Sequence, residues 1–94
     1  VNTDKHIAFL DNDRLNFPLI IRKWKEGDFF YPIGMSGKKK LSDFFIDNKL
    51  SLFDKEDCWL LCSGDDIVWI IGHRIDDRFK VSEDTKKAYI AELF

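Results

Sequence analysis

Short apolar segments, separated by clusters of turn-forming residues, run along nearly the whole chain. We expect a first strand at residues 6–10 and a turn at residues 11–13. The segment 17–24 is rich in β-branched and aromatic residues and predicts a second strand. Pro18 lies near its start, where a missing N–H is tolerated. A Gly-Asp pair at 27–28 ends this strand.

The clearest pattern is a β-hairpin in the second half of the chain. Two apolar runs, at residues 58–62 and 67–71, flank a turn at residues 63–66 that contains Gly and two Asp. The second run, IVWII, is apolar at every position and therefore on both faces of a strand. It predicts a central strand that is covered on both sides.

Two further strands are expected towards the end of the chain. Polar and apolar residues alternate over residues 78–81, so Phe79 and Val81 should face the core while the two basic residues face solvent. The segment 86–94 suits either a strand or a helix by its residue types, and we assign it to a strand.

Two short helices are expected in the middle of the chain. We predict the first from Ser42 to about Asn48, with Ser42 as its N-cap and with Leu41 and Ile46 as a hydrophobic staple. Asp three positions after a Ser predicts a second helical segment over residues 51–56.

The 94 residues form a single domain, 1–94, which can bury one modest core. Nine Phe, three Trp and two Tyr make that core rich in aromatic side chains. The expected fold class is α+β and β-rich, with a small mixed sheet or sandwich and one or two short helices. We find no apolar run long enough to span a bilayer and no secretory signal pattern, so we expect a cytoplasmic protein with no membrane partner. The chain begins with Val1, which suggests a fragment of a longer protein.

Lys38, Lys39 and Lys40 follow a bend at residues 31–37, which contains Pro and two Gly, and they precede the first predicted helix. A helix N-terminus carries partial positive charge, so cations beside it can form an anion-binding corner. In a chain with no catalytic motif, this corner indicates phosphate binding, and we expect the phosphates to be those of a nucleic-acid backbone. A solvated loop is the alternative.

Charge is distributed unevenly although the net charge is only −2. Residues 20–50 contain seven Lys/Arg against four Asp/Glu, whereas residues 51–66 contain one Lys against five Asp/Glu. This asymmetry is compatible with one phosphate-facing side and one acidic side. It is also within the range of an ordinary protein surface.

Four other basic residues have two interpretations each. Arg22 is either a half-buried arginine paired with Asp28 or Asp43, or a phosphate contact. A second basic group is interrupted by two aspartates, which could hold its arginines as ion-pair partners. Structural and RNA-contacting roles stay open for its members, Arg74, Arg78 and Lys80.

No catalytic or metal site is evident. The two cysteines, Cys58 and Cys62, lie in an apolar strand, on one face and about 13 Å apart at ~3.3 Å per residue, too far for a disulfide or a shared metal. We interpret them as small buried hydrophobic residues in a reducing compartment. His73 follows a strand end, but nothing orients it towards either thiol. The chain contains no P-loop and no glycine-rich phosphate fingerprint.

Three blocks of the sequence resemble the C-terminal domain of bacterial tRNA(Ile)-lysidine synthetase. The first holds a Gly-Asp pair with Pro32, Gly34 and Met35; the second is GKKKLSDFFIDNK at 37–49; the third is GHRIDDRFKVSEDT at 72–85. The apolar runs at 59–61 and 67–70 fit the family's hairpin, so the resemblance covers about residues 18–93. The chain departs from it at Phe29, where many relatives have Arg.

The resemblance implies a function for the parent protein. The full enzyme attaches lysine to the wobble cytidine of a CAU-anticodon isoleucine tRNA and consumes ATP in an N-terminal domain that is absent from this chain. The C-terminal domain is implied to be a small β-rich module, related to a domain of the phenylalanyl-tRNA synthetase β subunit, that holds the tRNA near its acceptor stem. The family's basic positions correspond to Lys39, Lys40, Arg74, Arg78 and Lys80.

These inferences lead to one expectation and one rival. The expectation is a tRNA-binding domain with no catalytic residues and no cofactor of its own, whose partners are isoleucine tRNA and the catalytic domain. The RNA-binding candidates are Lys38, Lys39, Lys40, Arg22, Arg74, Arg78 and Lys80. The rival is a structural module that packs against the rest of its enzyme and contacts RNA little. The aromatic surplus and the acidic segment 51–66 favour the rival.

Overall fold

The computed structural model describes residues 4–94, which form three antiparallel sheets, two short α-helices and two 3-10 turns. One sheet pairs β1 with β8, a second has the strand order β2-β5-β6-β7, and a third pairs β3 with β4. In chain order the elements are β1 (Ile7–Asp11), η1 (Asn12–Arg14), β2 (Leu19–Lys23), β3 (Phe29–Phe30), β4 (Lys39–Lys40), α1 (Leu41–Asp47), α2 (Leu52–Glu56), β5 (Trp59–Ser63), β6 (Asp66–Ile70), β7 (Arg74–Ile75), η2 (Asp77–Phe79) and β8 (Ala88–Glu92).

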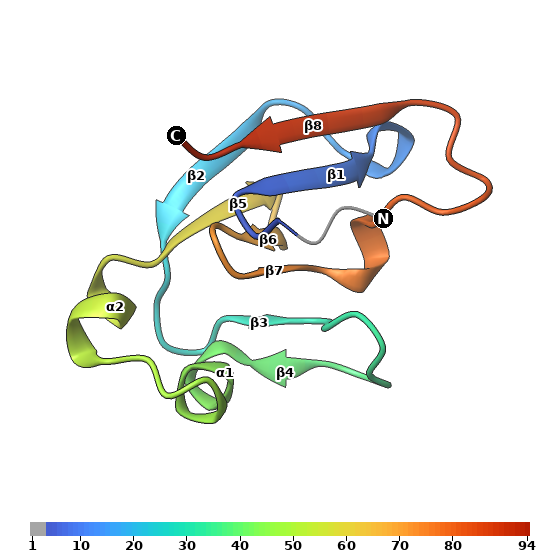
Figure 1. The fold of residues 1–94 in the computed structure, drawn as a ribbon. Helices are drawn as coiled ribbons and strands as arrows, with labels where there is room; N and C mark the ends of the chain where they lie inside the picture. Colours follow the sequence, from blue (N-terminus) through green and yellow to red (C-terminus); the bar gives the residue numbers. More distant parts are fainter. Residues whose placement is uncertain (1–3) are drawn as a thin grey trace.

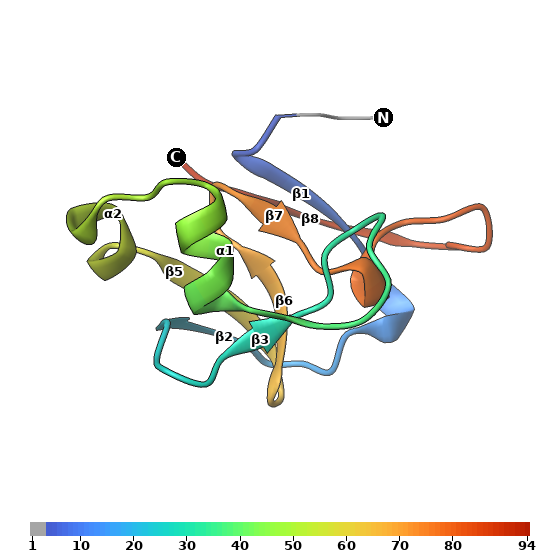
Figure 2. The same ribbon diagram turned by 90° about the horizontal axis from the view of Figure 1, so that it is seen from below.

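The four-stranded sheet forms the middle layer of the molecule (Figure 1). The β1-β8 ribbon lies along one side of it, and the β3-β4 hairpin with α1 lies along the other. Seen from below, α1 crosses the middle sheet (Figure 2). The predicted β-rich α+β class with two short helices is therefore confirmed. Within residues 4–94, no helix is long and apolar enough to cross a membrane.

Strand β6 lies at the centre of the fold, between β5 and β7, as its uniformly apolar sequence predicted. Ile67 and Ile70 pack into a core cluster beneath α1 and β3, whereas Val68 and Trp69 pack into a second cluster beneath β1 and β8. All four side chains are buried. One strand thus supplies both halves of the core.

The pairing of β5 with β6 contains an irregularity that explains this division. Leu61 lies opposite Trp69 and Cys62 lies opposite Ile67, so Val68 has no residue opposite it on β5. Such an extra residue is a β-bulge, and it interrupts the strict alternation of faces. Two consecutive residues of β6 can therefore enter the same core cluster.

Several predicted elements are confirmed. The first strand, the hairpin at 58–71 and the final strand form β1, β5-β6 and β8. The second helix, α2, has Ser51 as its N-cap, with a full capping box in which the Ser51 side chain accepts from the Asp54 N–H and the Asp54 side chain accepts from the Ser51 N–H.

The predicted start of α1 is wrong. The helix begins at Leu41, and its N-cap is Lys40, whose side chain makes no capping hydrogen bond. Leu41 is fully buried while Ile46 is 67% exposed, so the two residues form no staple. The chain enters the helix directly from β4, and the Leu41 N–H donates to the Asp28 carbonyl oxygen at 2.9 Å. Packing of Leu41 in the core, rather than a Ser42 cap, fixes this helix start.

The strand expected at residues 78–81 is also wrong. Asp77–Phe79 forms the 3-10 turn η2, because the side chain of Asp76 accepts a hydrogen bond from the Arg78 N–H and caps the turn. Phe79 is buried as expected, but Val81 is 40% exposed. Alternation over four residues was too short to distinguish a strand from a capped turn.

The C-terminus of α1 places a non-glycine residue in the left-handed region. Lys49 has φ = 54°. The Leu50 N–H donates to the Phe45 carbonyl at 3.0 Å and the Lys49 N–H donates to the Ile46 carbonyl at 3.1 Å, which is the Schellman arrangement. Glycine is the residue that normally takes this position, because a Cβ is strained there.

We therefore expect Lys49→Gly to stabilise the domain by about 0.5–1 kcal/mol, since it relieves the strain without removing a core contact. Thermal or denaturant unfolding measures the change. Lys49→Ala is the matched control, because it also removes the exposed side chain but keeps the Cβ. A gain of the same size in both variants would show that the lysine side chain, not the backbone strain, is the cause.

Candidate nucleic-acid interface

The lysine triplet lies on a short hairpin that the sequence did not predict, because each of its strands has only two residues. Phe29 pairs with Lys40, and Phe30 pairs with Lys39. Phe30 is fully buried in the core cluster beneath α1, which anchors the hairpin. The loop between the strands carries Gly37 at φ = 85°, a conformation that side chains rarely adopt.

The three lysines, two in β4 and Lys38 directly before it, do not share one face. Lys38 and Lys40 lie two residues apart and share a face of the hairpin with Phe29, since paired residues point to the same side. The Lys38 ammonium lies 4.5 Å from the centroid of the Phe29 ring, a cation–π contact. Lys39 points to the other side, where its ammonium forms an ion pair with Asp47 of α1 and its side chain is only 21% exposed.

All three lysines line one open hollow of about 510 Å³ between the hairpin and α1; its other lining residues are Met35, Asp43, Ile46 and Asp47. A second hollow of about 220 Å³ shares Met35, Lys39 and Asp47 with the first and is bounded by Arg74 of β7. The structure therefore brings four of the seven predicted cations together. We refer to Lys38, Lys39, Lys40 and Arg74 as the basic corner.

The basic corner has an excess of positive charge, with four cations against the carboxylates of Asp43 and Asp47. Lys40 and Arg74 are exposed. Within residues 4–94, neither of these two side chains forms an ion pair, and Lys38 forms none either. Three cations are thus available to an external anion.

Lys5 lies near Arg74, and sequence reasoning did not identify it. Lys5, His73 and Arg74 line a further small hollow of about 110 Å³, together with the acidic residue Asp4. Burial, and then the charge of Lys5, lowers the pKa of His73 below its ordinary value. The imidazole is consequently neutral at neutral pH and adds no charge to the surface. Nothing in the spacing of residue 5 from the other cations could have revealed this proximity.

Arg22 lines neither hollow of the corner and forms the ion pair with Asp28 that the sequence offered as one of its two interpretations. Its guanidinium donates two hydrogen bonds of 2.9 Å to the two carboxylate oxygens of Asp28. Burial alone would raise the pKa of Asp28, but hydrogen bonds from Arg22 and from the Lys25 N–H outweigh it and hold the pKa below its usual value. Arg22 is therefore committed to holding the turn that follows β2.

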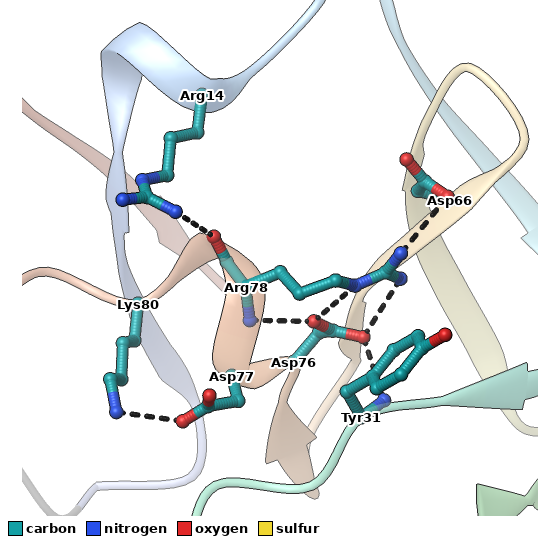
Figure 3. A network of polar contacts seen from close by, with 7 residues as sticks. All are labelled: Arg14, Tyr31, Asp66, Asp76, Asp77, Arg78 and Lys80. Carbon is teal, nitrogen blue, oxygen red and sulfur yellow. Dashed lines mark hydrogen bonds and ion pairs between the residues drawn. The ribbon is translucent and has the colours of Figure 1, made fainter. Parts of the chain in front are cut away.

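Arg78 lies in a second network, around the fully buried carboxylate of Asp76 (Figure 3). Its Nε donates to Asp76 Oδ1 at 3.0 Å and its Nη2 donates to Oδ2 at 3.1 Å. Its Nη1 also donates to Asp66 at 3.3 Å, and the guanidinium stacks 4.2 Å from the Tyr31 ring centroid. These contacts hold η2 against the hairpin loop.

Lys80 is paired as well, through an ammonium that donates to Asp77 Oδ1 at 2.7 Å (Figure 3). Arg14, which the sequence did not single out, donates to the Arg78 carbonyl oxygen at 3.3 Å and lies 3.5 Å from Asp11. Both aspartates that interrupt the second basic group thus hold a neighbouring cation, which the sequence gave as one of two possibilities.

The two cysteines are buried, and neither forms a disulfide. Both belong to the core cluster beneath α1, as expected for residues on one face. Burial raises the pKa of the Cys58 thiol to about 11 and also raises that of Cys62. Among residues 4–94, no group of three or more His, Cys, Asp or Glu side chains is placed to hold a metal ion.

Sequence reasoning also missed the apolar part of the corner. Met35 and Ile46 line the larger hollow and are 53% and 67% exposed. The sequence pattern predicts a hydrophobic staple of Ile46 with Leu41, so it does not indicate that the Ile46 side chain is exposed. Asp43 and Asp47 are four residues apart on α1 and so lie on one helix face.

Comparison with known proteins gives a consistent result. The family model described as the TilS substrate C-terminal domain matches residues 19–92. A tRNA(Ile)-lysidine synthase of Parabacteroides distasonis is 57% identical over 93 residues, which is 99% of this chain and 21% of that protein. A tRNA(Ile)-lysidine synthase of Bacteroides thetaiotaomicron is 47% identical over 90 residues, covering 96% of this chain and 21% of that protein.

The fold also matches a solved structure, described as the crystal structure of TILS C-terminal domain. The TM-score is 0.80 at 22% sequence identity, and the match covers 96% of this chain and 69% of the other. At that identity the likeness supports the fold alone. The chain spans about a fifth of the length of the two relatives named above.

Substitutions of Arg74 and Arg78, the two arginines of the second basic group, should differ in their effect on stability. Arg78→Gln removes three side-chain hydrogen bonds to aspartates, two of them to a buried carboxylate, and should cost about 1.5–3 kcal/mol of unfolding free energy. Arg74→Gln, at an exposed position without an ion pair in the described chain, should stay within about 0.5 kcal/mol of wild type. Urea denaturation of both variants decides the matter; equal effects would remove the distinction between a structural and an available arginine.

The buried thiols should be almost unreactive in the folded protein. With a pKa of about 11 in place of 9.0, the thiolate fraction of Cys58 is about a hundredfold lower than for an ordinary cysteine at neutral pH. Reaction with a thiol reagent at pH 8 should therefore follow unfolding as urea is added. Rapid labelling of both cysteines without denaturant would contradict their placement in the core.

Proposed function

Since the chain belongs to the TilS substrate C-terminal domain family, we propose that it is the tRNA-binding domain of a tRNA(Ile)-lysidine ligase. In this proposal the basic corner contacts phosphates of isoleucine tRNA near the acceptor stem. The parent enzyme attaches lysine to the wobble cytidine of the CAU anticodon and uses ATP to do so. In this proposal, lysine attachment and the use of ATP both take place in the part of the protein outside this chain.

The observation that carries the proposal is the basic corner itself. Lys38, Lys40 and Arg74 are exposed and form no ion pair within the described residues, and they come from the β3-β4 hairpin and from β7. Exposed cations without a carboxylate partner can neutralise phosphates and release their counterions, and a nucleic-acid backbone supplies closely spaced phosphates. By contrast, Arg22, Arg78 and Lys80 already have carboxylate partners. We therefore assign RNA contact to the corner and not to those three.

The geometry suits recognition of shape rather than sequence. An A-form stem presents phosphates and 2′-hydroxyl groups more readily than base edges, and lysine ammonium groups bind phosphate without specifying a base. The domain's role is then positional: it fixes the tRNA while the catalytic part of the enzyme acts on a distant nucleotide. The domain itself contributes no catalytic residue and no cofactor, and the enzyme acts in the cytoplasm.

A docking module remains the second candidate, and exposed apolar residues favour it. Ile20 and Ile21 of the edge strand β2 are 52% and 60% exposed, and Phe53 of α2 is 81% exposed. These residues lie on elements other than the hairpin and β7. The two functions are therefore compatible in space, and a partner domain could cover β2 or α2 while RNA occupies the basic corner.

The decisive variant is Lys38→Glu with Lys40→Glu in the full-length protein. Loss of two phosphate contacts should weaken isoleucine tRNA binding about tenfold or more and should flatten the slope of log K against log salt by roughly 1.5–2. The fold should survive, because both side chains lie on the exposed face of the hairpin. Fluorescence anisotropy at several salt concentrations measures both quantities.

Lys86→Glu with Lys87→Glu is the matched control. These two lysines are also exposed and lie in the loop before β8. Replacing both by Glu changes the net charge by the same amount. The control should leave the salt slope unchanged. If the two double variants weaken binding equally, the corner has no special role and the docking module becomes the better proposal.

A further inference from the structure

The larger hollow of the basic corner has features that phosphate contact does not require. Met35 and Ile46 place large apolar side chains among its lysines, at 53% and 67% exposure. Contact with a duplex backbone is made by cations and hydrogen-bond donors, which gain nothing from such neighbours. Exposed apolar side chains beside cations are instead suited to an unstacked base, whose faces are apolar while its phosphate is charged.

Asp43 is the second such feature. Its carboxylate lines the same hollow, on the outer face of α1, and would repel a phosphate bound there. Asp47 is neutralised by Lys39, whereas Asp43 forms no ion pair within residues 4–94. A free carboxylate accepts hydrogen bonds from the exocyclic amino groups of nucleobases, cytosine N4 among them. Its presence therefore distinguishes a site for a base from a site for phosphate alone.

We propose that this hollow holds an unpaired, amino-bearing nucleotide of the tRNA. The base contacts Met35 and Ile46, its amino group donates to Asp43, and the flanking phosphates are bound by Lys38 and Lys40. At about 510 Å³ the hollow has the size of sites that hold small organic ligands. Near the acceptor stem, the unpaired nucleotides are those of the 3′ end. This inference rests on the proposed function and adds a single-stranded component to it.

The test combines one substitution with one change in the RNA. Ile46→Ala keeps a good helix former at an exposed position of α1, so the fold is preserved. Binding of the full-length protein is measured with isoleucine tRNA and with the same tRNA trimmed of its unpaired 3′ nucleotides. We expect Ile46→Ala to weaken binding of intact tRNA about tenfold, the scale of burying most of an aliphatic side chain against a ligand, and to leave binding of trimmed tRNA unaffected. Trimming the tRNA should weaken its binding to the wild-type protein by a similar factor.

Leu52→Ala is the matched control, because Leu52 is also a large aliphatic residue on a short helix and is 69% exposed. It should bind both RNAs as wild type does. The inference is overturned if Ile46→Ala weakens both RNAs equally or neither of them. Asp43→Asn gives an independent reading: it should also weaken intact tRNA alone, and tighter binding of both RNAs would identify Asp43 as a mere electrostatic obstacle and overturn the inference.

Failure of this inference is distinguishable from failure of the proposed function. Ile46→Ala removes an apolar contact and should leave the salt slope unchanged, whereas the lysine variant flattens it. If the lysine variant weakens tRNA binding as expected and Ile46→Ala does not, the basic corner contacts RNA but the hollow does not hold an unpaired nucleotide. If the lysine variant changes neither the tRNA affinity nor the salt slope, the proposed function is wrong.

Discussion

The buried carboxylate of Asp76 is the interaction on which the arrangement of the layers depends. It accepts four hydrogen bonds: from the Arg78 N–H and Nε on one oxygen, and from the Tyr31 N–H and Arg78 Nη2 on the other. The backbone continues the link, since the Asp77 N–H donates to the Tyr31 carbonyl at 2.6 Å. A buried ion costs several kcal/mol unless it is paired and hydrogen-bonded, so these partners must be present together. The hairpin that carries the lysines is thereby fixed against β7, which carries Arg74.

The sequence predicts those elements whose residue pattern is local and long enough to show a strand or helix signal. The apolar run that became β6, the hairpin turn before it and the capping box of α2 each contain their own signal. The β3-β4 hairpin does not, because two-residue strands have no period and exist through tertiary anchoring by Phe30. The same reason explains the helix start at Leu41, where burial and a long-range hydrogen bond replaced the expected cap.

The candidate site was predictable in its residues but not in their grouping. Lysine density identified the corner, yet the sequence could not decide which of the seven cations already had partners. The structure separates them partly by chemistry. Arg22 and Arg78 use planar guanidinium groups to satisfy both oxygens of a shielded aspartate, which a lysine cannot match. The cations left for an external anion are mostly lysines, whose flexible point charges suit a partner that arrives from solution.

The pairing of β1 with β8 determines when the molecule can complete its fold. Ile7 lies opposite Glu92 and Asp11 lies opposite Ala88, so the first and last strands of the sequence close one ribbon. Ala8, Leu10 and the rest of the core cluster beneath that ribbon are covered only once both strands are present. Contacts between such distant segments slow folding, because the entropy of closing the intervening chain must be lost first. On the ribosome, the half of the core beneath α1 can assemble early, while the other half must wait for the last strand to emerge from the exit tunnel.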